Sequence, residues 1–271
     1  MRASLIIKFR IYFEVNDLIY LAGWWLCEWI APASIAAKTL PRARHFPDSM
    51  KITRTLATCK TPDGAALTLH EHDSQHFLKV AGLQLMSTTA SSSEEQMAEL
   101  SCAHLPPRPR ILIGGLGFGF TLKRVLAMTG PDAVVDVAEL LPEVVAWNRE
   151  FLYEVNGKLL DDPRTRVHVG DVYDLIDRCG ENRYDAILLD VDNGPDPFVQ
   201  NVNERLYATP GITRIKNALR PEGRVIFWSA HPDKSFARSL GGFFKHVECI
   251  SAKAYPKAKR FSHTLFVADR D

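Results

Sequence analysis

The sequence predicts an α/β fold in which a seven-stranded, mostly parallel sheet carries helices on both faces. Two observations lead to this prediction. From residue 110 onward, short apolar segments alternate with helix-like segments, which is the pattern of parallel strands joined by crossover helices. The last two apolar segments follow one another without a helix between them, and such strands are usually antiparallel. The last strand is therefore expected to run antiparallel to its neighbours.

The elements of this sheet follow in a regular order. The predicted strands are Ile111–Gly114, Ala133–Ala138, Arg166–Val169, Asp185–Leu189, Arg224–Trp228, His246–Ile250 and His263–Val267. The predicted helices are Phe120–Met128, Pro142–Tyr153, Val172–Arg178, Asn203–Ala218 and Lys234–Phe244. Because parallel strands end at one edge of a sheet, residues that directly follow these strands are the first candidates for a site.

A smaller β unit is expected ahead of this sheet. Residues 65–70 and 76–80 alternate between apolar and polar side chains, and glycine turns flank them. Residues 91–103 then have the pattern of a helix with Glu94 in its first turn. The expected domains are residues 1–49 (an N-terminal extension), residues 50–103 (a small β-hairpin unit with a linking helix) and residues 104–271 (a Rossmann-like catalytic domain).

The composition is that of an ordinary globular protein. The chain has 271 residues, of which 46% are hydrophobic and 24% charged, and its net charge is +1. A nearly neutral chain lacks the basic stripe of a nucleic-acid binder, and we interpret the basic tract at residues 253–260 as a solvated face. The five cysteines are scattered without metal-ligand spacing, so we expect free thiols, no metal and a cytoplasmic location.

The first 49 residues allow three interpretations. Residues 18–37 are apolar apart from Glu28 and follow a few basic residues, as in a poor signal peptide or membrane anchor. Acids at Glu14, Asp17 and Glu28, and the lack of a disulfide pattern, favour instead a helix that packs on the domain or on a partner. A third interpretation is that translation begins at Met50. We expect a peripheral segment and no membrane association.

The first strand of the large sheet runs directly into a glycine-rich turn. Residues 110–119 read RILIGGLGFG, and a helix-like stretch follows. Glycines let the backbone bend sharply and let a ligand approach where a Cβ would collide. Strand, glycine turn and helix together hold nucleotide-like cofactors in doubly wound α/β domains. The candidate cofactor-binding glycines are Gly114, Gly115, Gly117 and Gly119.

The spacing of these glycines separates two kinds of cofactor site. A dinucleotide oxidoreductase carries G-x-G-x-x-G with an acid about twenty residues further on. Here the third glycine comes one position early, at Gly119, which gives the G-x-G-x-G that S-adenosylmethionine-type domains accept. The alternative is that the glycine turn is purely structural and binds no cofactor. The prediction thereby becomes a Rossmann-like S-adenosylmethionine methyltransferase fold.

Three acids follow successive predicted strands beside this turn. Glu139 is placed to accept hydrogen bonds from both ribose hydroxyls, the alternative being an exposed acid at a strand end. Asp171 is placed to accept the adenine amine, to cap the helix that follows, or to do both. Asp190 ends the fourth strand, where α/β sheets place reactive groups. Together the three acids indicate an adenosyl ligand.

With these residues in view, the sequence resembles the polyamine aminopropyltransferases, the spermidine and spermine synthase family. The resemblance extends from about residue 64 to the C-terminus. It implies transfer of an aminopropyl group from decarboxylated S-adenosylmethionine to an amine or polyamine acceptor, and a homodimer or larger assembly. The matching stretches are Ile111–Gly119, Val137–Val145, Val169–Asp171 and Tyr184–Asp190, with Val80–Met86 upstream.

The chain departs from this family's pattern at three places. Leu116 and Phe118 stand in the glycine turn, where the family commonly has G-G-G-D-G. Residues 91–96 read SSSEEQ where a Tyr-His-Glu element is expected, and the loop from Asp190 reads DVDNGPDP in place of D-S-x-D-P. Two alternatives therefore stay open: a small-molecule methyltransferase that uses S-adenosylmethionine, and a noncatalytic member of the fold.

The acidic loop is where catalysis is expected. An amine is protonated at neutral pH and must lose a proton before it attacks a sulfonium, and Asp190 is the candidate base. His231, after the fifth strand, is an alternative base. The acids that follow Asp190 suit a second cationic nitrogen, although a solvated loop is the alternative. The candidate substrate-binding residues are Asp192, Asp196, Tyr207 and Gln84.

Overall fold

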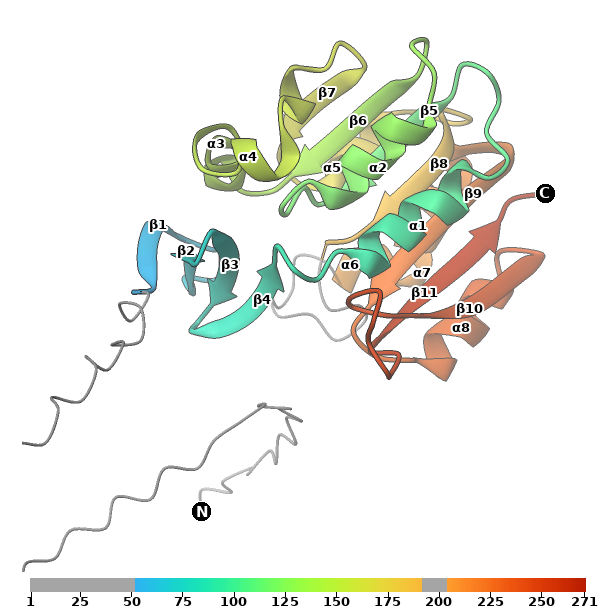
Figure 1. Ribbon diagram of the computed structural model, residues 1–271. Coiled ribbons are helices and arrows are strands. Elements are labelled where there is room, and N and C mark those ends of the chain that lie inside the picture. The colour runs from blue at the N-terminus through green and yellow to red at the C-terminus, as the bar shows by residue number, and fades with distance from the viewer. Residues whose placement is uncertain (1–51, 192–203) are drawn as a thin grey trace, which may run out of the picture. The chain divides into compact units, whose positions relative to one another are not determined.

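The structure, a computed structural model, describes residues 52–191 and 204–271 (Figure 1). The described residues belong to one compact unit, Ser49–Asp271, which holds a seven-stranded sheet and a four-stranded sheet. The predicted N-terminal extension, Asp192 and Asp196 lie outside the described residues. Within the described ranges, no helix is long and apolar enough to cross a membrane.

The large sheet has the strand order β10-β11-β9-β8-β5-β6-β7. The strands from β9 to β7 run parallel, and β11 lies antiparallel between β9 and β10. The predicted seven-stranded, mostly parallel sheet with an antiparallel last strand is therefore confirmed. Its strands are β5 (Arg110–Gly114), β6 (Val134–Glu139), β7 (Thr165–Val169), β8 (Tyr184–Leu189), β9 (Leu219–Ser229), β10 (His246–Ala252) and β11 (His263–Asp269).

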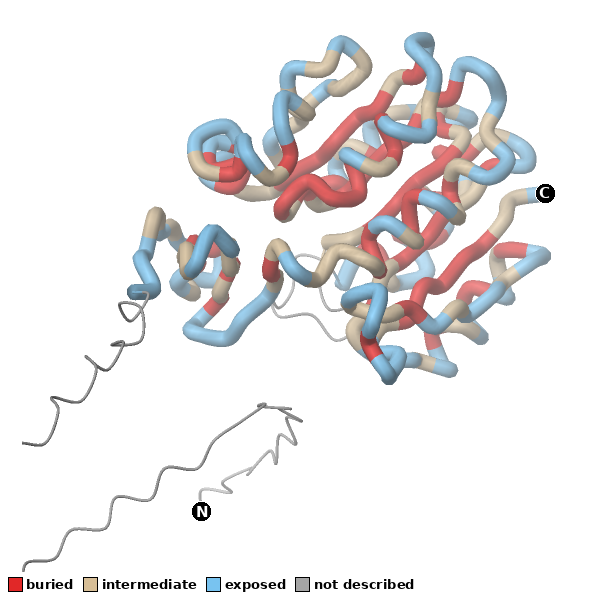
Figure 2. The backbone as a smooth tube through the Cα atoms, in the orientation of Figure 1, coloured by how far each residue is buried: buried red, intermediate tan, exposed pale blue. Residues whose placement is uncertain are grey.

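Two apolar cores cover the two faces of this sheet. Leu112 of β5 belongs to the core shared with α5, α7 and α8, whereas Ile111 and Ile113 belong to the core shared with α1 and α2. This alternation follows from the period of two along a strand. Figure 1 shows α1 and α2 beside one another over the sheet, and Figure 2 shows buried residues running along its central strands. These helices are α1 (Ser92–Cys102), α2 (Phe120–Met128), α5 (Val172–Arg178), α7 (Thr209–Ala218) and α8 (Lys234–Gly241).

The helix predicted over residues 142–153 is divided in the structure. It forms α3 (Pro142–Glu150) and α4 (Tyr153–Asn156), followed by a short 3₁₀ turn, Leu159–Asp161. The backbone leaves regular helical geometry between them, with φ values of −112° at Phe151 and −104° at Leu152. The break turns the chain so that α4 returns toward the glycine turn.

The helix predicted over residues 203–218 is also divided. It forms α6 (Glu204–Tyr207) and α7, with an extended residue, Ala208, between them. Pro210 lies in the first turn of α7. Proline is tolerated in a first helical turn but breaks a helix interior, so Pro210 favours a new helix start here.

The residues ahead of α1 form a four-stranded antiparallel sheet. The sequence predicted its two inner strands, which bury one face. The edge strands were not predicted, because most of their residues are exposed and alternate only weakly. The strands, in spatial order, are β1 (Arg54–Lys60), β2 (Ala66–His72), β3 (Gln75–Val80) and β4 (Leu83–Ser87).

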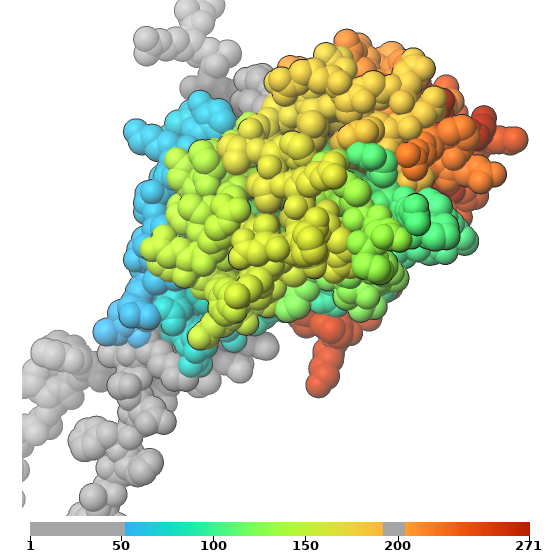
Figure 3. All heavy atoms as spheres, turned by 90° about the horizontal axis from the view of Figure 1, so that it is seen from above, coloured from blue at the N-terminus to red at the C-terminus, as the bar shows by residue number. Residues whose placement is uncertain are grey.

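The small sheet packs on the glycine turn and on α3. Leu67 and Leu69 of β2 and Leu78 of β3 share an apolar core with Phe118 and Trp147. In the space-filling view of Figure 3, the blue residues of the small sheet adjoin the yellow-green segment that holds α3. This contact places the small sheet over the carboxyl ends of the parallel strands.

Candidate active site

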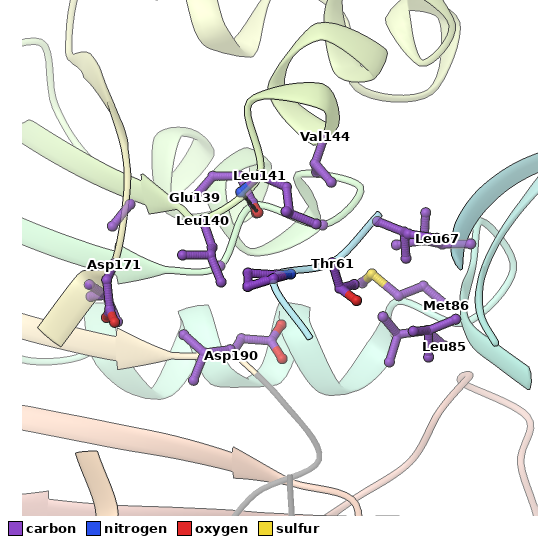
Figure 4. A pocket seen from close by; sticks show the side chains of 18 of the residues that line it. Thr61, Leu67, Leu85, Met86, Glu139, Leu140, Leu141, Val144, Asp171 and Asp190 are labelled. Atoms are coloured by element: carbon purple, nitrogen blue, oxygen red, sulfur yellow. Dashed lines mark hydrogen bonds between the residues drawn. The ribbon is translucent and has the colours of Figure 1, made fainter. Parts of the chain in front are cut away.

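A cavity of about 180 Å³ lies where the small sheet meets the carboxyl ends of the parallel strands. This is the edge at which open α/β sheets bind ligands. Much of the wall is apolar, with Leu67, Leu85 and Met86 from the small sheet and Leu141 and Val144 from the segment after β6 (Figure 4).

The glycine turn forms one side of this cavity. At Gly115 the backbone has φ +91°, and a Cβ would lie 2.1 Å from the carbonyl oxygen of Asp190, so only glycine fits. The N–H of Asp190 donates to the carbonyl of Gly114 at 2.9 Å, which ties the turn to the end of β8. At Gly117, a Cβ would lie 2.7 Å from Sδ of Met86. Gly115 and Gly117 line the cavity, whereas Gly114 and Gly119 shape the turn around it.

The two apolar residues of the turn point away from the cavity into the protein. Leu116 is 5% exposed and Phe118 is 1% exposed, and they pack in the cores under the large and the small sheet, respectively. Neither brings a charge to the cavity wall. If the cavity holds a cationic ligand, the acid that faces it must come from another element.

Two buried asparagines hold the turn in place. Asn148 of α3 donates to the carbonyl of Gly117 at 2.8 Å, and Asn156 of α4 donates to the carbonyl of Phe118 at 3.2 Å. Asn156 also donates to Oδ1 of Asn148 at 2.6 Å. The break between α3 and α4 brings Asn156 back to the turn, an arrangement that a single continuous helix would not give.

Glu139 lies at the end of β6 with its carboxylate against the turn. It is 8% exposed; its Oε2 accepts the N–H of Leu116 at 2.9 Å, and its Oε1 accepts the N–H of Leu141 at 3.0 Å. Burial raises the pKa of Glu139, and these backbone N–H groups oppose that rise. The backbone N–H groups of Gly117 and Leu140 act on this carboxylate as well, so a ligand hydroxyl shares its oxygens with the backbone of the turn.

Asp171 caps α5, the alternative that the sequence left open. Its Oδ1 accepts the N–H of Tyr173 at 2.8 Å, and its Oδ2 pairs with the guanidinium of Arg205 at 2.5 Å. Arg205 comes from α6 and also lies over the ring of Tyr173, 4.4 Å from the ring centre. Asp171 lines the cavity as well, and each of its carboxylate oxygens can accept more than one hydrogen bond.

Asp190 and Glu94 line the cavity together. Asp190 follows β8, and Glu94 belongs to the first turn of α1, which packs on β8 and β9. Burial, and second the negative charge of Glu94, raise the pKa of Asp190 to about 8. Burial also raises the pKa of Glu94, and the hydrogen bond from the Ser93 hydroxyl opposes that rise. Asp190 is therefore largely protonated at neutral pH while no cation is near.

The sequence did not identify Glu94 as a site residue. An acid after a run of serines is typical of a helix start, and its local pattern is the same whether the helix end is solvated or buried. Its burial comes from the packing of α1 on the sheet, which local sequence does not reveal.

The remaining predicted residues occupy different places. Gln84 is exposed on β4 beside the cavity residues Leu85 and Met86. Tyr207 packs against the rings of Phe227 and Phe236 in the core under α7 and α8 and does not line the cavity.

At the end of β9, it is Trp228 that lines the cavity, and His231 does not. The Trp228 ring stacks on that of His263, with 4.7 Å between the ring centres. Burial, and second the nearby His231, lower the pKa of His263 to about 4, so this ring is neutral at physiological pH.

Of the described residues, the ionisable side chains that line the cavity are all acidic. Its four charged lining residues are all acids, and no Lys, Arg or His lines it among the residues that the structure describes. In the same part of the chain, no group of three or more His, Cys, Asp or Glu side chains is placed to hold a metal ion. Such a wall favours a cation and opposes a carboxylate. The acids are Glu94, Glu139, Asp171 and Asp190.

The fold and this site define an α/β domain with an acidic ligand cavity beside a glycine turn. A family model described as the spermine/spermidine synthase domain matches residues 91–237, more than half of the chain. The chain belongs to this family, as its sequence motifs predicted.

Curated relatives agree with this assignment. Over 145 residues the chain is 32% identical to polyamine aminopropyltransferase 1 of Hyperthermus butylicus, a match that covers 51% of this chain and 48% of that protein. It is 28% identical over 199 residues to polyamine aminopropyltransferase of Bacillus subtilis, covering 72% and 68% of the two chains. The chain spans about half the length of the first curated relatives that it matches.

Solved structures share the fold. A spermidine synthase in complex with the transition state analogue AdoDATO superimposes with a TM-score of 0.67 at 18% identity, covering 80% of this chain and 74% of that one. Spermidine synthase from Thermotoga maritima gives a TM-score of 0.65 at 17% identity, with 80% and 73% covered. The small N-terminal sheet followed by a methyltransferase-like domain is thus an architecture that spermidine synthases have.

Proposed function

We propose that this protein transfers an aminopropyl group from decarboxylated S-adenosylmethionine to a small amine. The acidic wall of the cavity carries this proposal. The acceptor is a cation at neutral pH, and the tail of the decarboxylated donor carries an ammonium group without a carboxylate. S-adenosylmethionine itself has a tail carboxylate, which a cavity with four acids and no basic lining residue would repel. Relatives named polyamine aminopropyltransferase support the same activity.

The adenosyl part of the donor fits the side of the cavity nearest the glycine turn. Glu139 is held by backbone N–H groups and lines the cavity, and we assign its carboxylate to the ribose hydroxyls. Leu141 and Val144 supply an apolar wall for the adenine ring. Asp171 is the acceptor that we assign to the adenine amine, beside its pairing with Arg205.

Asp190 is the base in this proposal. The acceptor nitrogen loses a proton to the Asp190 carboxylate, and its lone pair forms a bond to the propyl carbon next to the sulfonium. The carbon–sulfur bond breaks with its electron pair on sulfur, which leaves as a neutral thioether. A carboxyl whose pKa is raised to about 8 is a stronger base than an ordinary aspartate and is matched to proton transfer near neutral pH.

The remaining roles stay as the sequence suggested them, except for that of Tyr207. We propose that Asp192 and Asp196 hold a second cationic nitrogen of the acceptor, with Gln84 near the acceptor path. Tyr207 is not assigned to the acceptor, because its ring packs in the core. We further propose a cytoplasmic homodimer in which the base, Asp190, belongs to residues 104–271 and residues 50–103 complete the cavity wall.

The test is an assay of both donors with a panel of mono-, di- and polyamines, followed by mass spectrometry of the thioether product. We expect methylthioadenosine from decarboxylated S-adenosylmethionine in the presence of an amine. S-adenosylhomocysteine instead would establish a methyltransferase. Donor binding without either product would establish a noncatalytic binding protein.

A further inference from the structure

Glu94 is more deeply buried than an acid in the first turn of a helix needs to be. The neighbouring acid, Glu95, is exposed and accepts the hydroxyl of Ser91 at 2.9 Å, as an acid in a first helical turn ordinarily does. Glu94 is only 7% exposed, although it comes from the same turn. Burial of a carboxyl is unfavourable unless a partner compensates it.

Glu94 has few partners inside the protein. Among the described residues, one side chain donates to it, the hydroxyl of Ser93 at 2.5 Å. The rest of its carboxyl group faces the cavity that it lines with Asp190. In the same described residues, no side chain donates a hydrogen bond to Asp190. Two carboxyl groups from different elements thus face one cavity with spare acceptor capacity.

The other charged groups around Asp190 do not change this arrangement. Glu139 is held against the glycine turn by backbone N–H groups, and Asp171 is paired with Arg205. From β9, the uncharged ring of Trp228 lines the cavity. Among the described residues, Glu94 is the one whose charge raises the pKa of Asp190.

We propose that Glu94 is the second carboxyl of the acceptor subsite and that Glu94 and Asp190 together hold the reacting ammonium nitrogen. The inference rests on the proposed aminopropyl transfer and adds to it a residue of α1. One carboxylate holds the cation while the other takes its proton, so the nitrogen stays bound as its lone pair is released. In the empty cavity the pair shares a proton, since two close carboxylates do not both ionise readily. The arriving cation displaces that proton.

The test is the pH profile of kcat/KM for one amine acceptor in the wild type and in Glu94→Gln. This parameter reports ionisations of the free enzyme and free substrate, and the acceptor's own ionisation is common to both proteins. We expect the acid limb of Glu94→Gln to move to lower pH by about one unit or more, because Asp190 loses its charged neighbour. We also expect KM for the acceptor to rise about tenfold or more, from the loss of a charge-assisted contact.

Two further variants make the result specific. Glu94→Asp keeps the charge and should keep the acid limb nearer to that of the wild type. Glu99→Gln makes the same chemical change on the exposed part of α1, where Glu99 pairs with Arg124, and should superimpose on the wild type. The melting temperature of empty Glu94→Gln should not fall, since the substitution removes a buried charge.

The outcomes separate this inference from the proposed function. Wild-type protein without methylthioadenosine production would overturn the aminopropyl transfer itself. Turnover in the wild type, with an unmoved acid limb and an unchanged KM in Glu94→Gln, would overturn the role of Glu94 alone. A lower melting temperature with an unmoved acid limb would make Glu94 a purely structural residue.

Discussion

At the scale of single residues, Asp190 both contacts the glycine turn through its backbone and carries the proposed base. Its backbone N–H and C=O lie against Gly114 and Gly115, while its carboxyl faces the cavity. We expect Asp190→Asn to lower kcat by about 10²- to 10⁴-fold, the usual contribution of a general base. The donor dissociation constant should change little, because the adenosyl contacts that we propose come from Glu139 and Asp171. Single-turnover kinetics and isothermal titration calorimetry measure the two quantities.

A matched control uses an aspartate outside the cavity. Asp132 is exposed and makes only a loose pair with Arg108 at 3.4 Å, so Asp132→Asn should leave both quantities unchanged. If Asp190→Asn keeps wild-type kcat, Asp190 is not the base.

The site residues that the sequence identified lie at the ends of strands, whereas those that it missed lie on helices. Glu139, Asp171 and Asp190 each lie at or just beyond the end of a parallel strand, so a strand prediction alone brings them to one edge. Glu94 and Asn148 lie on helices, and their meeting with the cavity or the turn depends on how those helices pack. No local pattern carries that information, which is why a helix-start acid proved to be buried beside Asp190.

The glycine turn is the element on which the site depends most directly. At Gly115, a Cβ would collide with the backbone of Asp190, and φ +91° is unfavourable for any other residue. We expect Gly115→Ala to lower the free energy of unfolding by roughly 2–4 kcal/mol, from strain and overpacking. Because the collision is with the residue that carries the proposed base, kcat should fall further than the remaining folded fraction explains.

Chemical denaturation and kinetics on the same preparation test this prediction. Gly241→Ala is the control, since a Cβ at this last residue of α8 would meet no atom within 4 Å. Its stability should be unchanged or higher by up to about 1 kcal/mol. Equal stabilities of Gly115→Ala and the wild type would show that the turn adapts to a side chain.

At the scale of whole elements, the sequence predicted the strands of the large sheet but missed the edge strands of the small sheet and two helix breaks. The central strands of the large sheet are apolar and were predicted, as was β10, which exposes most of its residues. β1 and β4 also expose most of their residues and were not predicted. The breaks after α3 and α6 also went unpredicted. At the first break the helical pattern continues through Phe151 and Leu152, and the hydrogen bonds that Asn156 makes to the turn become visible only in three dimensions.

At the scale of the whole molecule, the cavity requires both sheets. Its acids come from the large-sheet domain and α1, whereas much of its apolar wall comes from β2, β3 and β4. The sequence predicted the large sheet and a hairpin of the small one, but not that the two sheets would enclose a cavity with four acids and no basic lining residue among those described. This charge is a property of the assembled fold, and it links stability to pH.

The stability of the empty protein should fall as pH rises from 6.5 to 8.5. Asp190 has a pKa of about 8 in the folded protein, above its ordinary value of about 4 in an unfolded chain. The folded state therefore binds the proton more tightly, and the resulting stability is full below the unfolded pKa and is lost as pH rises through about 8. His263 acts in the opposite sense at lower pH, since its folded pKa of about 4 costs stability as pH falls below about 6.5. Cys59, whose pKa is raised to about 11, acts only at higher pH. Melting temperatures across this window should decline for the wild type and stay level for Asp190→Asn, and parallel curves for the two proteins would show that Asp190 does not carry the shifted proton.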